Sequence, residues 1–163
     1  MRLVVQRVSK AKVTTKKDLP AGRQVRKVVG EIGKGLFVLL GIKKEDTEKS
    51  VELLANKLLK LRVMSDEQDK QSLAGKAGKM NLSVKDSGGE ILVVSQFTLH
   101  ADVSGGNRPS FINAEEPSKA KKLYELFISK LRELGIKVET GSFGDYMEIE
   151  TILDGPVTIL YLD

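Results

Sequence analysis

Four segments of the chain have the hydrophobic patterns of β-strands. Apolar and polar residues alternate imperfectly from Arg2 to Thr14, and this two-residue period predicts a strand with one buried face. Val28 to Ile32 is expected to return as a second strand. Leu36 to Leu40 and Ile91 to Val94 are continuous apolar runs, which are typical of strands buried on both faces.

Polar stretches separate these predicted strands. Thr15 to Lys27 is rich in lysine and arginine and contains Pro20 and Gly22, so it is expected to form an exposed hairpin loop. Ser65 to Gly78 is polar and contains glycine, and it is also expected to be a loop.

Two further segments carry apolar residues at helical spacing. The first opens at Asp46-Thr47, where either side chain can cap a helix. The second begins near Pro117, a good first-turn residue, and is expected to end before Gly135. The apolar stripes consist of Val51, Leu54, Ala55, Leu58 and Leu61 in the first helix, and of Ala120, Leu123, Tyr124, Phe127, Leu131 and Leu134 in the second. Each stripe predicts a helix that packs against the core through one face.

Three strands are expected to close the chain: Ile136 to Thr140, Tyr146 to Leu153, and Val157 to Leu162. Asp154-Gly155-Pro156 stands between the last two and indicates a tight turn, although a Gly-Pro bond can also be cis. Together these elements predict the α/β class. The expected architecture is a compact layered fold of mixed β-sheets covered by two main helices, in one domain spanning residues 1–163.

Composition narrows the class of protein further. The 163 residues contain no cysteine, which excludes disulfides, cysteine-based zinc sites and a cysteine nucleophile. The chain has no apolar run near the roughly 18 residues of a membrane span, and its first residues lack a signal-peptide pattern, so a cytoplasmic protein with no membrane partner is expected. The net charge of +5 and the pI of about 9.3 are compatible with an RNA partner, but many basic proteins bind no nucleic acid.

Few residues offer conventional catalytic chemistry. His100 is the only histidine, which rules out a two-histidine metal site within one chain, and it is expected to lie in a solvent-accessible loop. The carboxylate pairs Glu115-Glu116 and Glu148/Glu150 are expected to be structural rather than acid–base dyads. Neither a metal nor a cofactor is expected. This set of residues suits a reaction whose substrate brings its own reactivity.

Small polar residues mark the exit of the second buried strand, in Ser95-Gln96-Phe97-Thr98-Leu99. A strand end that opens to solvent is a common position for binding groups, although the same pattern fits a strand end with incidental polar residues.

Several motifs together resemble the D-aminoacyl-tRNA deacylase family, the D-Tyr-tRNA deacylases of bacteria and eukaryotes. The resemblance covers nearly the whole chain. It is densest in Ser95-Gln96-Phe97-Thr98-Leu99, Arg108-Pro109-Ser110-Phe111 and Asp154-Gly155-Pro156-Val157-Thr158, and it extends to Val5-Gln6-Arg7-Val8, Val13-Thr14, Gly30-Glu31-Ile32-Gly33, the segment from Gly35 to Gly41, and Lys79-Met80-Asn81-Leu82.

The resemblance implies an aminoacyl-tRNA editing hydrolase with the compact layered α/β fold of the family. It would remove D-amino acids, and glycine, from tRNA, and it would reject L-aminoacyl-tRNA. The family resemblance places the strand Ser95 to Thr98 along the pocket for the terminal adenosine and its aminoacyl group. Gln96, Phe97 and Thr98 are then catalytic, and Ser95 and Phe111 bind the substrate.

The resemblance also implies a homodimer with a gate for chirality. Gly155 and Pro156 would form a cis dipeptide that the partner subunit inserts into the pocket, and Arg7 would hold this gate in place. The sequence departs from the family pattern at Leu153, where the family usually has asparagine, and at Asp145.

An aminoacyl ester is already activated, so a placed water or the neighbouring ribose hydroxyl, with an oxyanion site, suffices for its hydrolysis. Backbone N–H groups near Phe97 and Thr98 are candidates for that site. A covalent role for the Thr98 hydroxyl is disfavoured because the sequence shows no base to activate it. The resemblance likewise points to catalysis assisted by the RNA hydroxyl.

Other functions stay open at the level of the residues. A non-enzymatic tRNA- or RNA-binding module associated with translation fits the basic segments equally well. A small-molecule esterase is disfavoured by the lack of an evident histidine base, and an L-specific editing domain by the Gly155-Pro156 match. Residues 17–26 and 68–78 look like insertions relative to the family, and they are expected to lengthen surface loops.

Overall fold

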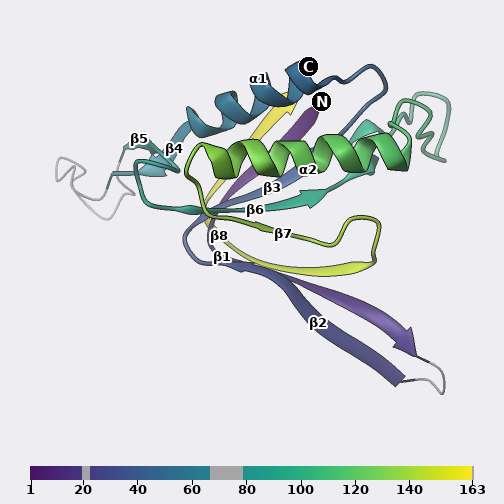
Figure 1. Ribbon diagram of the computed structural model, residues 1–163, viewed down its shortest axis with the longest axis horizontal. Coiled ribbons are helices and arrows are strands. Elements are labelled where there is room, and N and C mark those ends of the chain that lie inside the picture. The colour runs from purple at the N-terminus through teal and green to yellow at the C-terminus, as the bar shows by residue number, and fades with distance from the viewer. Residues whose placement is uncertain (20–22, 67–78, 163) are drawn as a thin grey trace.

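The computed structural model describes residues 1–19, 23–66 and 79–162. It shows a mixed sheet with two helices packed against it (Figure 1). The elements follow one another as β1 (Arg2–Leu19), β2 (Arg23–Ile32), β3 (Gly35–Gly41), α1 (Glu48–Leu59), β4 (Arg62–Ser65), β5 (Met80–Ser83), β6 (Glu90–Ser95), the short 3₁₀ helix η2 (Phe97–His100), α2 (Pro117–Glu133), β7 (Val138–Thr140) and β8 (Met147–Leu162). This architecture confirms the predicted α/β class of mixed sheet and two covering helices.

Strand β1 organises the main sheet, whose order is β2-β1-β3-β6-β7, with β8 paired to β1 outside that path. The pairs of β1 with β2, β3 and β8 are antiparallel, whereas β3–β6 and β6–β7 are parallel. A separate two-stranded sheet joins β4 and β5. Strand β8 follows β1 from Arg2 to Thr15, so the first and last strands of the chain lie side by side.

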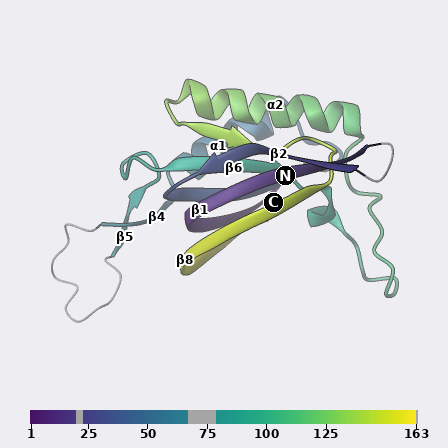
Figure 2. The same ribbon diagram turned by 90° about the horizontal axis from the view of Figure 1, so that it is seen from below.

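Helices α1 and α2 lie on one side of the main sheet, and β8 lies toward the other side (Figure 2). Thr47 caps α1, where its hydroxyl accepts from the Ser50 N–H and the Ser50 hydroxyl accepts in turn from the Thr47 N–H. Pro117 begins α2, and Gly135 follows its end with φ +86°, as the sequence predicts. Both predicted apolar stripes supply buried residues to the core.

Two hydrophobic clusters form the core, and β1 contributes to both. Leu3 and Val5 join the cluster under the helices, whereas Val8, Ala11 and Val13 join the cluster on the opposite face. The odd-numbered Ala11 and Val13 share a face with the even-numbered Val8 because β1 has one extra residue against β8 between Val8 and Lys10. This bulge explains the imperfect alternation of the sequence.

Three sequence expectations are wrong. Thr15 to Lys27 is strand over most of its length, because β1 and β2 continue their pairing as far as Leu19 and Arg23; only residues 20–22 lie outside the described part. The pair β4–β5 was not expected, and Ser65, assigned to a loop, ends β4. Residues 67–78 of that predicted loop lie outside the described residues.

The third correction concerns the end of the chain. Met147 to Leu162 is one strand, not two strands separated by a tight turn. Both halves pair with β1 in the same antiparallel direction, so Asp154-Gly155-Pro156 does not reverse the chain. The interruption read as a turn is an outward bulge of a continuous strand.

Within the described residues, no helix is both long enough and apolar enough to cross a membrane.

Candidate functional site

The bulge of β8 lies opposite Arg7 of β1. Leu153 pairs with Val8 and Thr158 pairs with Gln6, which leaves Asp154 to Val157 opposite the single residue Arg7. Proline is tolerated at such a position because a bulged edge strand does not need its missing N–H for the ladder. The predicted gate residues therefore form a local protrusion on an otherwise regular strand.

Arg7 is the side chain that holds this protrusion. Its guanidinium is buried, and Nε donates to the backbone carbonyl of Asp154 at 3.0 Å and pairs with the Asp154 carboxylate at 3.1 Å. Nη1 donates to the carbonyl of Val63 and to the hydroxyl of Ser65, both at 2.9 Å. One planar cation thus ties the bulge of β8 to β4. No local sequence signal points to β4 as a partner of Arg7, since Val63 is 56 positions away.

Gly155 and Pro156 are exposed at the tip of the bulge, and the peptide bond between them is cis. Gly155 has φ +133°, a conformation that L side chains rarely adopt. A Cβ there would lie 2.9 Å from the Val157 N atom and 3.3 Å from Arg7 Nη2. The bulge therefore requires glycine both for its backbone and for the close approach of Arg7. Leu153, the neighbouring departure from the family pattern, is 44% exposed.

The second group of predicted residues lies at the carboxyl end of β6, and here one expectation is corrected. Ser95 ends the strand, but Phe97 to His100 form η2, so the segment Ser95 to Thr98 is not a continuous strand. The Gln96 amide Nε2 donates to Thr98 Oγ1 across the start of this turn. The chain turns there because Gln96 N–H makes the last ladder bond, to Leu40 O at 2.8 Å.

Phe97 and Phe111 meet edge to face beside this turn. Their ring centroids are 5.0 Å apart with planes at 71°, a favourable aromatic geometry. Phe97 is nevertheless 57% exposed, so one aromatic surface faces solvent. Ser95 to Thr98 are adjacent along the chain, and Phe111 joins them through its ring contact with Phe97. The structure therefore groups the five predicted pocket residues at one place.

Two residues of the sheet fix η2 from below. A Cβ on Gly41, at the end of β3, would lie 2.9 Å from Leu99 Cβ and 3.1 Å from both Gln96 O and His100 Nε2, so the turn packs directly on this glycine. Arg2 of β1 donates from Nη1 to Leu99 O at 2.7 Å. The turn is therefore held by close packing on Gly41 and by the hydrogen bond from Arg2.

His100 is buried, which contradicts the expectation of a solvent-accessible loop histidine. Its exposed fraction is 3%, and no hydrogen bond of ordinary geometry reaches its Nε2 within the described structure. Burial lowers the pKa of His100, and the positive charge of Arg2 lowers it further, while the Gly41 backbone favours the protonated form in part. The imidazole packs under η2 as a buried apolar side chain would.

The two groups of predicted residues are separate within one chain. Arg2 contacts η2 and Arg7 contacts the bulge, and five residues of β1 span about 17 Å at ~3.4 Å per residue. In Figure 1 the loop that precedes α2 lies at one end of the molecule, while β4, the partner of Arg7, lies at the other. One chain therefore does not place its own bulge over its own turn.

Each of the two carboxylate pairs considered as dyads has at least one member in an ion pair. Glu148 pairs with Lys16 and with Arg26, and the hydrogen bond from Lys16 lowers the pKa of Glu148. A hydrogen bond from Lys119 likewise lowers the pKa of Glu115. These carboxylates stay ionised at neutral pH, as expected of structural groups, and neither acts as a raised-pKa acid.

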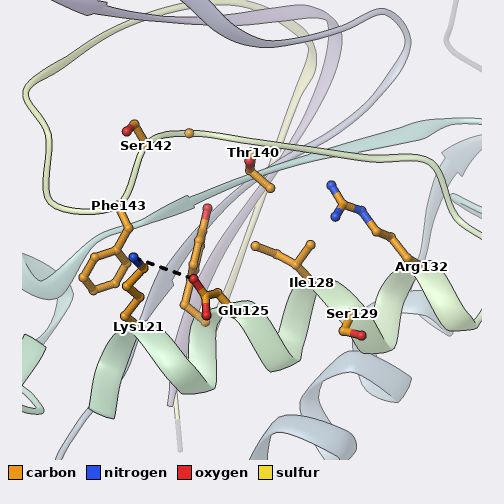
Figure 3. A pocket seen from close by; sticks show the side chains of 10 residues that line it. Lys121, Glu125, Ile128, Ser129, Arg132, Thr140, Ser142 and Phe143 are labelled. Atoms are coloured by element: carbon orange, nitrogen blue, oxygen red, sulfur yellow. Dashed lines mark ion pairs between the residues drawn. The ribbon is translucent and has the colours of Figure 1, made fainter. Parts of the chain in front are cut away.

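A cavity that sequence reasoning did not identify lies between α2 and the segment after β7 (Figure 3). Its volume is about 460 Å³, and Lys121, Glu125 and Arg132 line its rim. Tyr124 donates from its hydroxyl to Val93 O at 2.9 Å at its base, and burial raises the pKa of Tyr124. The predicted site residues do not line this cavity.

Large exposed apolar residues, here called the strip of β8, occur along both faces of this strand on both sides of the bulge. Its members are Ile149, Ile152, Leu153, Leu160, Tyr161 and Leu162, with exposed fractions between 36% and 65%. Within the described residues, no group of three or more histidine, aspartate or glutamate side chains is arranged to hold a metal ion.

The mixed sheet with two covering helices defines the chain as an α/β protein, and comparison with known proteins gives its family. The family model described as D-Tyr-tRNA(Tyr) deacylase matches residues 4–162. The chain therefore belongs to the D-Tyr-tRNA(Tyr) deacylase family, and it is a hydrolase.

Individual relatives agree with this assignment. A D-aminoacyl-tRNA deacylase of Thermotoga petrophila is 51% identical over 160 residues, which cover 98% of this chain and 95% of the relative. One of Aquifex aeolicus is 50% identical over 98% of this chain and 96% of the relative. A solved c-Myc DNA unwinding element binding protein superposes with a TM-score of 0.82 at 39% identity, over 100% of this chain and 99% of the other. A probable eukaryotic D-amino acid tRNA deacylase shares the fold, with a TM-score of 0.71 at 16% identity over 98% of this chain and 97% of the other.

Proposed function

We propose that this hydrolase cleaves the ester bond between a D-amino acid, or glycine, and the terminal adenosine of tRNA, and that it spares L-aminoacyl-tRNA. The observation that carries the proposal is the pair of half-sites on one chain: an exposed turn with its aromatic pair, and a protruding Gly155-Pro156 held by Arg7. The two lie on the order of 17 Å apart along β1. A complete site then takes its turn from one subunit and its bulge from a second copy.

Hydrolysis of an aminoacyl ester needs a stabilised oxyanion more than a strong nucleophile. The first N–H groups of a helical turn have no acceptor within that turn, and in η2 these belong to Phe97 and Thr98. One such donor aimed at the developing oxyanion is typically worth about 3–4 kcal/mol. We assign the oxyanion site to these two N–H groups, and the attack to water or to the ribose hydroxyl beside the ester.

Thr98 is a poor candidate for a covalent nucleophile. Within the described structure its hydroxyl oxygen accepts from the Gln96 amide, and an amide cannot remove a proton. The only imidazole, His100, is buried on the underside of the turn, with Nε2 against Gly41. Activation of a hydroxyl requires an adjacent base, so chemistry assisted by the RNA itself fits this site better.

The aromatic pair suits the terminal adenosine. Phe97 is more than half exposed and is held at a fixed angle by Phe111, so it offers a ready stacking surface for a base. Stacking of one base on an aromatic side chain contributes about 1–3 kcal/mol. Ser95 and Gln96 lie next to Phe97 and supply polar groups for the ribose or the aminoacyl group.

Selectivity follows from exclusion. The tip of the bulge, Gly155-Pro156 of the second subunit, presents rigid backbone toward the substrate Cα, so an L side chain would collide with it while a D side chain points away. Glycine has no side chain to exclude and is expected to be hydrolysed as well. Such discrimination uses a repulsive contact against the wrong substrate, rather than an added attraction for the right one.

A second copy of the chain fits the exposed strip of β8. Six large apolar side chains are exposed along β8 on both sides of the bulge, and large exposed apolar patches mark interaction sites. Closing the strip in a homodimer would bury it and bring the partner's bulge into reach. This arrangement explains why the gate lies on the same strand as the strip.

A non-enzymatic RNA-binding module is the second candidate function, and the net charge of +5 favours it as much as it favours the deacylase. The deciding experiment is hydrolysis of D-, L- and glycyl-tRNA by the purified full-length chain. Release of D-amino acid with retention of L-aminoacyl-tRNA supports the deacylase. Tight tRNA binding with no hydrolysis of any of the three esters would support the binding module instead.

A further inference from the structure

His100, the last residue of η2, is a buried titratable side chain that the proposed chemistry does not use. It closes the turn that carries Phe97 and Thr98, and its side chain points down onto the sheet rather than toward solvent. Its Nε2 lies 3.1 Å from the place where a Cβ on Gly41 would stand. The imidazole is thus wedged between the turn and the end of β3.

The surroundings of His100 favour the neutral imidazole. Arg2 of β1 and the Met1 amino group are the cations that act on it, and Asp46, in the loop before α1, is the anion. Asp46 is already committed, because its Oδ1 accepts from the Met1 amino group and its Oδ2 from the Lys43 N–H, both at 2.8 Å. Burial is the largest contribution to the lowered pKa of His100 and the two cations add to it, while the Gly41 backbone and Asp46 oppose it in part.

Protonation would therefore disturb the turn itself. A charged imidazole carries an N–H on both ring nitrogens; the Gly41 backbone favours the charged form in part, but Nε2 makes no hydrogen bond of ordinary geometry within the described structure. The new charge would also face Arg2, whose guanidinium holds Leu99 O at 2.7 Å. Both effects push against the backbone that carries the proposed oxyanion donors, because a buried unpaired charge is unfavourable.

We propose that His100 is a positioning residue: its neutral imidazole keeps the Phe97–His100 turn in its active shape, and its protonation switches deacylation off in mildly acidic solution. The inference rests on the proposed function, since it assigns the chemistry to this turn. His100 touches neither substrate nor reacting atoms in this scheme. It acts through the backbone of η2.

The direction of the switch follows from the shift in pKa. Folding lowers the pKa of His100 below its ordinary value of 6.5, so the neutral form prevails at neutral pH and the charged form appears only in more acidic solution. The acidic limb of the activity profile is expected below that value. Above it, His100 imposes no pH dependence on the rate.

Because the chain has a single histidine, its titration can be observed directly. One imidazole Cε1–H resonance is followed by NMR on the full-length protein, and single-turnover hydrolysis of D-aminoacyl-tRNA is measured over the same pH range, with spontaneous ester hydrolysis subtracted. The two midpoints are expected to coincide below the ordinary value of 6.5. One pH unit below the common midpoint, the rate is expected to have fallen about tenfold, as for a single titrating group.

Two variants distinguish titration of His100 from any other effect of acidic pH on the rate. His100→Gln, with each rate divided by the same variant's rate at about pH 8, is expected to lose the acidic limb because glutamine does not titrate. Asp102→Asn is the matched control: it removes the exposed carboxylate just after η2, and it is expected to keep the limb.

The outcomes are distinct. An acidic limb that persists in His100→Gln, or an NMR midpoint that differs from the kinetic midpoint by a full pH unit, would overturn the inference and leave the deacylase intact. If His100→Gln does not fold, agreement or disagreement of the two wild-type midpoints decides. Absence of deacylation at every pH would overturn the proposed function, and this inference with it.

Discussion

Arg7 holds Asp154 by two contacts from one nitrogen: Nε lies 3.0 Å from the backbone carbonyl oxygen and 3.1 Å from a carboxylate oxygen. The same guanidinium binds Val63 O and Ser65 Oγ of β4. Because it is buried and planar, it fixes both the position and the tilt of the bulge that follows. The proposed selectivity of this hydrolase for D- over L-aminoacyl-tRNA depends on that fixed position.

Replacing Arg7 by alanine is expected to loosen the bulge and weaken discrimination between D- and L-aminoacyl-tRNA. Loss of the guanidinium leaves the buried Val63 carbonyl without this donor, and such an unpaired group typically costs about 1–3 kcal/mol. Urea unfolding measures the loss of stability, and parallel hydrolysis of the D and L esters measures the selectivity. Lys10→Ala is the control, since it removes an exposed cation of the same strand; a D-to-L ratio equally changed in both variants would contradict this role.

Gly155→Ala is expected to reshape the bulge, because alanine disfavours φ +133° and its Cβ would meet the Val157 N atom at 2.9 Å. A residue forced into a rare backbone conformation costs on the order of 1–3 kcal/mol. We expect L-aminoacyl-tRNA to be hydrolysed faster relative to the D form. Gly33→Ala, where nothing lies within 4 Å of the new Cβ, is the matched control. Unchanged selectivity in Gly155→Ala would show that the bulge does not discriminate between the D and L esters.

Thr98→Ala is expected to retain deacylation within about tenfold, whereas loss of a true nucleophile costs on the order of 10⁶ in kcat. The expectation follows from the Gln96 amide, which donates to the Thr98 hydroxyl and cannot deprotonate it. Single-turnover rates with saturating enzyme separate chemistry from binding. A loss of many orders of magnitude with intact tRNA binding would make Thr98 the nucleophile.

Leu160→Asp is expected to convert a dimer into a monomer and to abolish deacylation. Leu160 is 61% exposed on the strip of β8, and a charge there would have to be buried in the proposed interface. Leu53→Asp is the control, because Leu53 is 65% exposed on α1, away from that strip. Light scattering after gel filtration gives the mass of each variant. A fully active Leu160→Asp monomer would rule out a site shared between subunits.

The sequence predicted those parts of the fold whose signals are local. The cap at Thr47, the first turn at Pro117 and the glycine after α2 each depend on a few neighbouring residues, and all three were found. The bulge at Asp154 to Val157 was read as a turn because Asp-Gly-Pro has the same composition in both settings. Only the pairing with β1, about 150 positions away, distinguishes them.

The burial of His100 was likewise hidden from local reasoning. A polar segment after a strand end indicates solvent exposure, but Gly41, more than 50 positions earlier, provides the space into which the imidazole packs. The link from Arg7 to β4 depends on a contact of the same long range. The candidate residues were therefore identifiable from motifs, while the long-range contacts that hold them in place required the structure.

The most direct test of this account is the ratio of hydrolysis rates for the same tRNA charged with the D and the L form of one amino acid. The full-length protein is expected to release the D-amino acid readily and to leave the L ester at its spontaneous rate, with glycyl-tRNA hydrolysed as well. Equal hydrolysis of the D and L esters would contradict the proposal that the bulge held by Arg7 selects between them.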